Sequence, residues 1–290
     1  MAGLPDYAEL VRAPAALTVI GDSLTGAAAA GRTGVRSMVG LPAASVLLYW
    51  AGMALNDAAD ADLDAVERPE RPIPSGRISR RRAFAVAGAL TLAGLGTAGL
   101  AGGRNSFAFA IPLAASIWTY DLAAKRGPMG PTVMAACRGL DVLLGAGTTG
   151  ARAGAGPAAL VAFHTSSLTA LSRGEVHGTR PLIALGSTAA TVLTAGAAIG
   201  RLRGGTDGGV GLLAAIGYLG PLLRAQGAAV GTPDATTVRA ATRQGIFAMI
   251  PLQAALVAGS GRPITSVALL ALHRLVLRRG RSFRAGGGVT

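Results

Sequence analysis

The chain has 290 residues, of which 51% are hydrophobic and only 14% are charged, and its formal net charge is +13. This composition excludes an ordinary soluble domain and is typical of an all-α polytopic membrane protein. Because the basic residues are scattered over loops and form no basic domain, they disfavour a nucleic-acid partner. They favour an anionic membrane surface and an anionic substrate.

The first residues, 1–11, form a polar segment without the basic-then-apolar order of a secretory signal, so the first span is expected to stay in the protein. Apolar stretches follow, several of them shorter than the roughly 20 residues that cross a bilayer. They lie near 13–30, 38–57, 83–101, 106–122, 132–150, 157–172, 182–200, 208–224, 244–259 and 263–277. We expect about nine transmembrane helices, with a tenth short one as the alternative, in a single domain over 1–290 that ends in a flexible basic and Gly-rich tail at 280–290.

The long polar connections follow the second, fourth, sixth and eighth spans. Together with the N-terminal segment and the C-terminal end, which would lie on the same side of the membrane, they carry 19 of the 27 basic residues. Basic loops of membrane proteins stay on the cytoplasmic side. We therefore expect a plasma-membrane protein whose N-terminus and polar loops face the cytoplasm. The loops near 56–82 and 172–181 occupy equivalent places, which predicts a weak repeat of two four-helix groups.

The loop after the second span gathers acidic residues. Asn56, Asp60 and Asp64 recur at i, i+4 and i+8, so they are expected to project from one face of a helix. Asp62 would be solvated on the other side, and Asp57 would be intermediate. Carboxylates at the end of an apolar span favour a hard cation such as Mg²⁺ held against a phosphorylated substrate. The alternative is a solvated loop with helix-capping carboxylates.

Basic residues follow the acidic ones. Prolines on both sides of Arg71 stop the helix and stiffen the loop, so Arg71 can place a bidentate fork on phosphate oxygens. Arg77 and Arg80–Arg82 are expected to anchor the next helix at the lipid headgroups. Lys125 is the single lysine and follows Tyr120 after the fourth span. It is either a point charge for phosphate or a topological signal.

Together these runs resemble a known family. NDAADADLD at 56–64 followed by RPIPSGRIS at 71–79 resembles the first Asp-rich motif of the UbiA superfamily of intramembrane prenyltransferases. The resemblance covers most of the chain and includes Tyr120 with the later Lys125-Arg126. The run SRGEVHG at 172–178 is most similar to an EboC-like branch of that superfamily.

The resemblance implies a helical bundle around a central cavity that opens toward the cytoplasmic leaflet. It also implies Mg²⁺-dependent transfer of an isoprenyl group from an isoprenyl diphosphate to an aromatic or other electron-rich acceptor, with Mg²⁺ neutralising the leaving diphosphate. The implied metal ligands are Asn56, Asp60, Asp64 and Glu175. The implied diphosphate contacts are Asn56, Arg71, Tyr120, Lys125 and Arg138. Catalysis is assigned to Asp60, Asp64 and Lys125.

The loop after the sixth span departs from the family pattern. Relatives usually carry a second Asp cluster there, whereas this loop has Glu175 as its only carboxylate. Ser172 offers a neutral oxygen, and His177 is either a general base, a phosphate donor or an ordinary loop residue. Whether a second Mg²⁺ binds at this loop is open at this point.

Four of the ionisable residues within predicted spans are candidates for a functional role, namely Asp22, Arg138, Asp141 and His164. Arg138 and Asp141 stand at i, i+3. Either the two residues form a buried ion pair, or Arg138 contacts a phosphate group of the substrate. Asp22 and His164 either face the reaction cavity or form helix–helix hydrogen bonds.

Two other functions fit the same sequence. A terpene cyclase of the same fold would act on the prenyl diphosphate alone, without an acceptor. A non-catalytic membrane carrier would use the intramembrane Asp and Arg residues without chemistry. The sequence leaves the identity of the acceptor and the length of the prenyl chain undetermined.

Overall fold

The computed structural model describes residues 3–202 and 204–285, with backbone alone for 14, 15 and 279–285. All regular secondary structure in these residues is helical, which confirms the all-α prediction. The chain divides into two compact units, Met1–Ala158 and Ala159–Thr290, and the division falls inside one long helix. The predicted repeat would have divided after the fourth span instead. A single domain over 1–290 stays a prediction.

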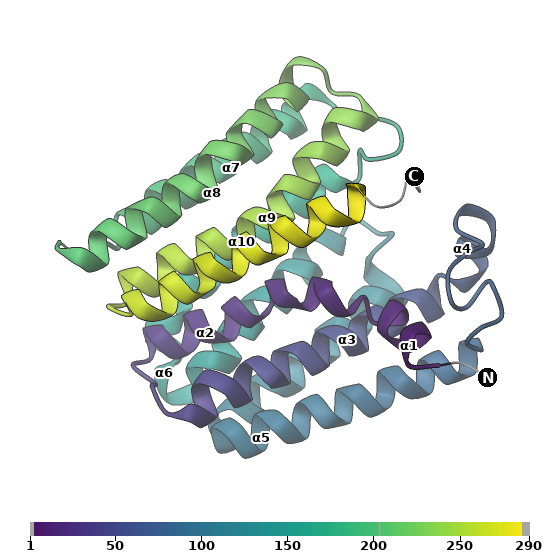
Figure 1. The fold of residues 1–290 in the computed structure, drawn as a ribbon, viewed down its shortest axis with the longest axis horizontal. Helices are drawn as coiled ribbons and strands as arrows, with labels where there is room; N and C mark the ends of the chain where they lie inside the picture. The colour runs from purple at the N-terminus through teal and green to yellow at the C-terminus, as the bar shows by residue number, and fades with distance from the viewer. Residues whose placement is uncertain (1–2, 203, 286–290) are drawn as a thin grey trace. The chain divides into compact units, whose positions relative to one another are not determined.

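The elements run in chain order as labelled in Figure 1. The first unit contains α1 (Leu4–Leu10), a 3₁₀ segment (Ala13–Thr18), α2 (Ile20–Ala29), a π-helical segment (Arg36–Gly40), α3 (Leu41–Ala59), α4 (Ala61–Glu67), α5 (Arg80–Thr119), the π-helical turn η3 (Tyr120–Ala124) and the first part of α6 (Gly130–Ser172). The second unit contains the rest of α6, α7 (Pro181–Ile199), α8 (Thr206–Gly231), α9 (Ala235–Gly259) and α10 (Pro263–Ala285). Residues 280–285, expected in the tail, thus belong to α10, while 286–290 lie outside the described residues.

The helix α5 is a hairpin of two antiparallel halves. Its backbone leaves helical geometry at Gly103, where φ is 64° and ψ is −161°. The Trp118 indole N–H donates to the Thr91 hydroxyl over 3.1 Å, although these residues are 27 positions apart. A straight helix would separate them by about 40 Å. Because φ is positive, glycine is the residue suited to this reversal. The halves match the predicted spans near 83–101 and 106–122.

The helix α6 also turns back on itself, at Gly147, where φ is 69°. A Cβ added to Gly154 would lie 2.8 Å from the Ala146 Cβ, whereas a straight helix would separate these residues by about 12 Å. The sequence placed this break between 150 and 157, within the run of small residues. That position was wrong, because the glycine with positive φ lies earlier.

Several helices can cross a membrane. Among the described residues, four have the length and apolar composition of a span: Arg36–Ala59, Arg80–Ala124, Pro181–Ile199 and Thr206–Gly231. The apolar helix Ala16–Ala29 is shorter. The remaining predicted spans coincide with α6, α9 and α10, which are not among these four. The polytopic helical architecture is therefore confirmed.

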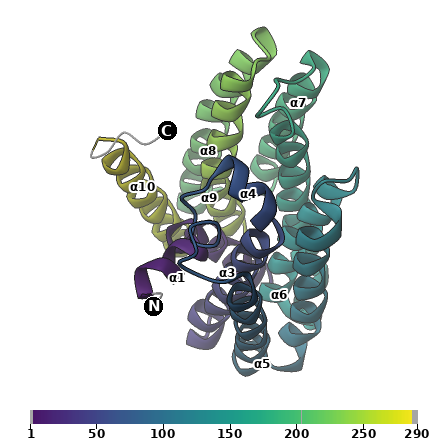
Figure 2. The same cartoon turned by 90° about the vertical axis from the view of Figure 1, so that its right-hand side faces the viewer.

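Small residues allow close helix packing in the first unit. The helices α3 and α5 lie side by side in both views (Figures 1 and 2), with Leu48 of α3 packed on Gly94 of α5. A Cβ on Gly26 of α2 would collide with the Val142 carbonyl of α6, and a Cβ on Gly145 would collide with the Ser23 carbonyl. Backbones in membrane bundles approach this closely only at small residues. This packing holds α2, α3, α5 and α6 around the pocket described below.

Candidate active site

The acidic run bends at Asp60. The helix α3 ends at Ala59, Asp60 has φ −95° and ψ 9°, and α4 begins at Ala61. The expectation that Asn56, Asp60 and Asp64 share one face of one helix was therefore wrong. A chain of main-chain hydrogen bonds still links them, since the Asp60 N–H donates to the Asn56 carbonyl and the Asp64 N–H to the Asp60 carbonyl.

The Asp60 carboxylate is held by two cations from the segment after α5. Lys125 Nζ lies 2.7 Å from one carboxylate oxygen, and Arg126 Nη2 lies 2.8 Å from the other. The Lys125 side chain is 13% exposed and that of Arg126 is 67% exposed. Lys125 is thus the less exposed partner, and it lies against the acidic run.

Arg71 joins two further carboxylates. Its Nη1 lies 2.6 Å from Asp64 Oδ2 and 3.4 Å from Asp57 Oδ1, and both carboxylates are buried. Arg12 Nη2 approaches Asp57 Oδ1 to 2.8 Å from the start of the chain. Asp57, expected to be intermediate, is therefore part of the cluster. Arg71 reaches it because the prolyl loop folds back, with the Ile78 N–H bonded to the Pro72 carbonyl.

Other charged residues of this loop point elsewhere. The Asp62 side chain is 89% exposed and pairs with Arg80 over 3.2 Å, so it is solvated as predicted. Arg77 Nη1 lies 2.9 Å from Asp6 and 2.7 Å from Glu9, which ties α1 to the loop. The Gly3 N–H and the Arg77 guanidinium lower the pKa of the Asp6 carboxyl. Arg77 thus anchors a neighbouring helix of the protein.

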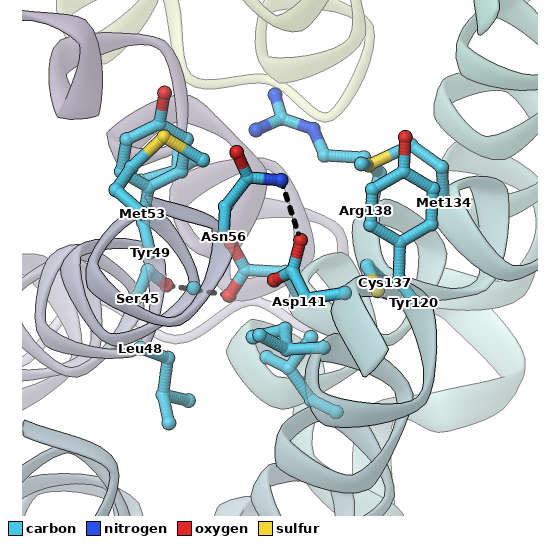
Figure 3. A pocket seen from close by; sticks show the side chains of 15 residues that line it. Ser45, Leu48, Tyr49, Met53, Asn56, Tyr120, Met134, Cys137, Arg138 and Asp141 are labelled. Carbon is cyan, nitrogen blue, oxygen red and sulfur yellow. Dashed lines mark hydrogen bonds between the residues drawn. The ribbon is translucent and has the colours of Figure 1, made fainter. Parts of the chain in front are cut away.

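A pocket with a volume of about 110 Å³ lies beside this ion-paired cluster. Figure 3 shows the residues that line it. Its wall is largely apolar and includes Leu48, Met53, Leu113, Ile117 and Met134. Its polar groups include Ser45, Tyr49, Asn56, Tyr120, Asp121, Arg138 and Asp141. A second, more polar pocket shares Asp121 and is lined by Asp60, Lys125 and Arg126. Asp121 therefore borders both the apolar space and the ion-paired cluster.

Asp121 is the residue that the sequence reading missed. It is 5% exposed, and its Oδ1 accepts a hydrogen bond from Asn56 Nδ2 over 2.8 Å. A carboxylate at the end of the apolar run 106–122, directly after Tyr120, was the available signal.

Arg138 and Asp141 take different partners. Arg138 Nε lies 2.9 Å from Asp22 Oδ2, and its Nη2 donates to the Thr18 carbonyl over 3.0 Å. Asp141 Oδ1 accepts from the Ser45 hydroxyl over 2.6 Å. Arg138 thus forms its ion pair with Asp22, which is fully buried, and not with Asp141.

In the second unit, His164 is buried within a helix–helix hydrogen-bond network. Its Nδ1 lies 3.0 Å from the Tyr218 hydroxyl of α8, and its Nε2 lies 3.2 Å from the Gly245 carbonyl of α9. These contacts support the helix-joining interpretation of His164. A tautomer that donates from one nitrogen and accepts at the other satisfies the hydroxyl and the carbonyl together.

The loop after α6 is held by its backbone. The Thr179 N–H donates to the Pro233 carbonyl, and the Glu175 carbonyl accepts from Arg239 Nη1 over 2.9 Å. Gly178 has φ 81° and packs against Pro233. Among the residues whose side chains the structure describes, none forms an ion pair with the Glu175 carboxylate, and His177 is exposed.

The donor set of the first unit fits magnesium. Mg²⁺ takes one or two carboxylates and fills its other positions with water and substrate oxygens. Asp60, Asp64 and the Asn56 oxygen supply ligands of this kind. No group of three or more His, Cys, Asp or Glu side chains that could hold a metal by themselves occurs in the described part of the chain. A ligand phosphate would complete such a coordination sphere.

Curated relatives match parts of the chain. Digeranylgeranylglyceryl phosphate synthase of Ignicoccus hospitalis is 36% identical over 121 residues, which are 41% of this chain and 39% of the relative. The enzyme of the same name from Methanothrix thermoacetophila is 53% identical over 57 residues, 20% of this chain and 21% of the relative. These matches span about two fifths or less of the relatives' length.

The solved structures that are similar extend over more of the fold. A UbiA homologue from Archaeoglobus fulgidus, bound to GPP and Mg²⁺, superposes with a TM-score of 0.64 at 16% identity, covering 90% of this chain and 99% of that one. The sequence profile of the UbiA prenyltransferase family matches residues 17–223. This match confirms the resemblance drawn from the motifs: the chain belongs to the UbiA prenyltransferase family.

Proposed function

We propose that this protein is a Mg²⁺-dependent intramembrane prenyltransferase that moves an isoprenyl group from an isoprenyl diphosphate to an acceptor. One observation carries the proposal: buried or partly buried carboxylates and partly buried cations meet beside a largely apolar pocket. That combination suits a ligand with a highly charged head and an apolar chain. Family membership and the Mg²⁺ and GPP bound by the Archaeoglobus fulgidus homologue support it.

In this structure the carboxylates and the cations are paired with each other. In the proposed complex the carboxylates would bind Mg²⁺ and the cations would bind diphosphate. Asp60, Asp64 and Asn56 would hold Mg²⁺, with Glu175 as a further ligand. Lys125 and Arg71 would exchange their present carboxylate partners for diphosphate oxygens, which accept the same charge-assisted hydrogen bonds. Bound Mg²⁺ would supply the positive charge that makes diphosphate a good leaving group.

Two pocket residues would complete the diphosphate site. Tyr120 lines the pocket next to Asp121, so its hydroxyl can face a phosphate oxygen. Arg138 lines the same pocket and is oriented by Asp22 and the Thr18 carbonyl. Its guanidinium is thereby held in place for an anionic group of a ligand. Preorganised charges of this kind stabilise a transition state without reorganisation during the reaction.

The chemical step follows from this arrangement. The bond between the allylic carbon and the diphosphate oxygen breaks, and its electron pair leaves with diphosphate. An electron pair of the acceptor forms the new bond to that carbon, and the acceptor loses a proton to water or to the released diphosphate. The apolar wall of Leu48, Leu113 and Ile117 keeps water from the cationic carbon.

The relatives' names suggest the acceptor to test first. Digeranylgeranylglyceryl phosphate synthases from several archaea match this chain, so we propose a hydroxyl of an isoprenylated glyceryl phosphate as acceptor. An aromatic acceptor is the alternative. We also propose that the N-terminus and the loops 56–82 and 172–181 face the cytoplasm at the plasma membrane, because the loops and chain ends assigned to that side together carry most of the arginines.

The test uses purified protein in nanodiscs with Mg²⁺ and radiolabelled geranylgeranyl diphosphate. Label that moves to geranylgeranylglyceryl phosphate, and that stops with EDTA, supports the proposal. A cyclic hydrocarbon or alcohol formed without any acceptor would make the protein a terpene cyclase. Unchanged diphosphate in every mixture, together with tight binding, would favour the carrier.

A further inference from the structure

The Asn56 side chain has two ends of equal size and opposite chemistry. Its NH₂ group donates to Asp121 Oδ1 over 2.8 Å. An ionised carboxylate only accepts hydrogen bonds, so it selects the NH₂ end of the amide. The carbonyl oxygen of Asn56 must then point the other way. Figure 3 shows this oxygen directed away from the bonded carboxylate, at the side of the pocket.

Asp121 is fixed in position by its surroundings. It lies on η3, where the helix widens into a π-turn after α5. On the facing helix α3, a Cβ at Gly52 would lie 3.8 Å from Asp121 Oδ2 and 3.0 Å from Ile117 Cγ2. Glycine at this place, one turn before Asn56, leaves room for Ile117, and the Asp121 carboxylate lies at ordinary contact distance beside it. A π-turn inside a helix often marks a functional site.

We propose that Asp121 is a positioning residue that orients Asn56 so that the amide oxygen serves as a ligand for the metal–diphosphate group. This inference rests on the proposed function, because it assigns that oxygen a place in the Mg²⁺ site. Metal ligands are commonly oriented by such outer partners, whose loss costs about 10–100-fold in metal affinity. Asp121 lies outside the motifs that carry the family resemblance. Its hydrogen bond with Asn56 is seen only in the folded structure.

Exchange of the two side chains tests the assignment. Asp121→Asn removes the carboxylate that selects the amide end, and Asn56→Asp places two carboxylates against each other. The double variant Asn56→Asp/Asp121→Asn restores one amide–carboxylate hydrogen bond with the donor on the other side. It also presents a carboxylate oxygen at position 56.

Electron paramagnetic resonance measures the binding of Mn²⁺ to each variant in nanodiscs that contain a non-hydrolysable prenyl thiodiphosphate. The melting temperature of each variant is measured in parallel. We expect Asp121→Asn to weaken Mn²⁺ binding at least about 10-fold. The double variant should bind within a few-fold of the wild type. Asp62→Asn, at an exposed position of the same run, is the matched control and should bind as the wild type does.

Two results would overturn the inference while leaving the proposed function standing. One is wild-type Mn²⁺ affinity in Asp121→Asn, whether or not its melting temperature falls. The other is a double variant that binds Mn²⁺ no better than Asp121→Asn. Wild-type protein that binds no Mn²⁺ with the analogue would overturn the proposed function and this inference together.

Discussion

The two polar loops, 56–80 in the first unit and 172–181 in the second, hold their charges differently. In the first loop, side chains meet side chains: Asp57, Asp60 and Asp64 are paired with basic groups and lie at most half exposed. In the second loop, backbone groups make the contacts, and Glu175 engages Arg239 through its carbonyl alone among the contacts described. The charged groups of the first loop can therefore exchange their present partners for a charged ligand. The second loop is mainly a turn held by backbone hydrogen bonds.

The same contrast holds for buried polar groups away from the loops. In the first unit, Ser45, Arg138 and Asp141 line a pocket. In the second unit, His164 and Tyr218 bond to each other and to a neighbouring backbone. Polar groups inside a membrane protein are costly unless they serve packing or function. This comparison indicates that the buried polar groups of the first unit serve mainly function, and that those of the second unit serve mainly helix packing.

The largest expected effect concerns the paired carboxylates. Asp60→Asn or Asp64→Asn should lower the rate of Mg²⁺-dependent diphosphate release about 100-fold or more, because each removes a carboxylate proposed to hold the Mg²⁺ that neutralises the leaving diphosphate. Asp62→Asn is the control, since its side chain is 89% exposed. Equal rates in all three variants would remove the metal assignment.

The next effect concerns the buried lysine. Lys125→Ala should raise the concentration of prenyl diphosphate needed for half-maximal rate about 10-fold, because a charge-assisted bond to phosphate contributes roughly 1.5–3 kcal/mol. Arg126 pairs with the same Asp60 carboxylate but is exposed, so Arg126→Ala should have a smaller effect. A change confined to the acceptor requirement would contradict the role given to Lys125.

A substitution in the second loop tests the comparison itself. Glu175→Gln should raise the Mg²⁺ requirement several-fold but leave the maximal rate within about 10-fold of the wild type, as expected for a secondary ligand. Glu67→Gln, in the exposed part of the first loop, is the control. A loss as large as that of Asp60→Asn would show that both loops contribute equally.

In the second unit, a polar substitution should affect stability without affecting catalysis. Tyr218→Phe removes the hydroxyl bonded to His164. Hydrogen bonds between membrane helices average about 0.6 kcal/mol, so a loss of about 1 kcal/mol is expected. The melting temperature in detergent should fall slightly while the turnover rate stays unchanged. A large loss of turnover in folded protein would place Tyr218 in the reaction.

The smallest effect concerns α1 and pH. The usual pKa of Asp6 is near 3.8, and in the folded protein it is lower, first through the Gly3 N–H and then through Arg77. The contact therefore stabilises the folded state above pH 3.8 and is lost as the pH falls through the lower, folded value. Hydrogen exchange of α1 should speed up only in this acid range. Arg77→Ala should make it fast at neutral pH, and no change there would contradict the anchoring role.

The sequence anticipated what depends on composition and local spacing. Helical spans, the acidic run and the prolyl loop with Arg71 follow from nearby residues, whereas the contact of Lys125 with Asp60 depends on the fold. The bend at Asp60 was missed because helical periodicity alone cannot mark a helix end without a glycine or proline. The partners Asp22 for Arg138 and Asp121 for Asn56 were missed because they lie 116 and 65 positions away. Only the packing of α2 and η3 brings them together.

The most direct test is to locate the metal in the protein with Mn²⁺ and a prenyl thiodiphosphate bound. Anomalous scattering from crystals should place Mn²⁺ about 2.1 Å from oxygens of Asp60 or Asp64, with Lys125 and Arg71 turned to the phosphates. A metal bound elsewhere, with Asp60 still paired to Lys125 and Asp64 to Arg71, would contradict the exchange of partners on which this account depends.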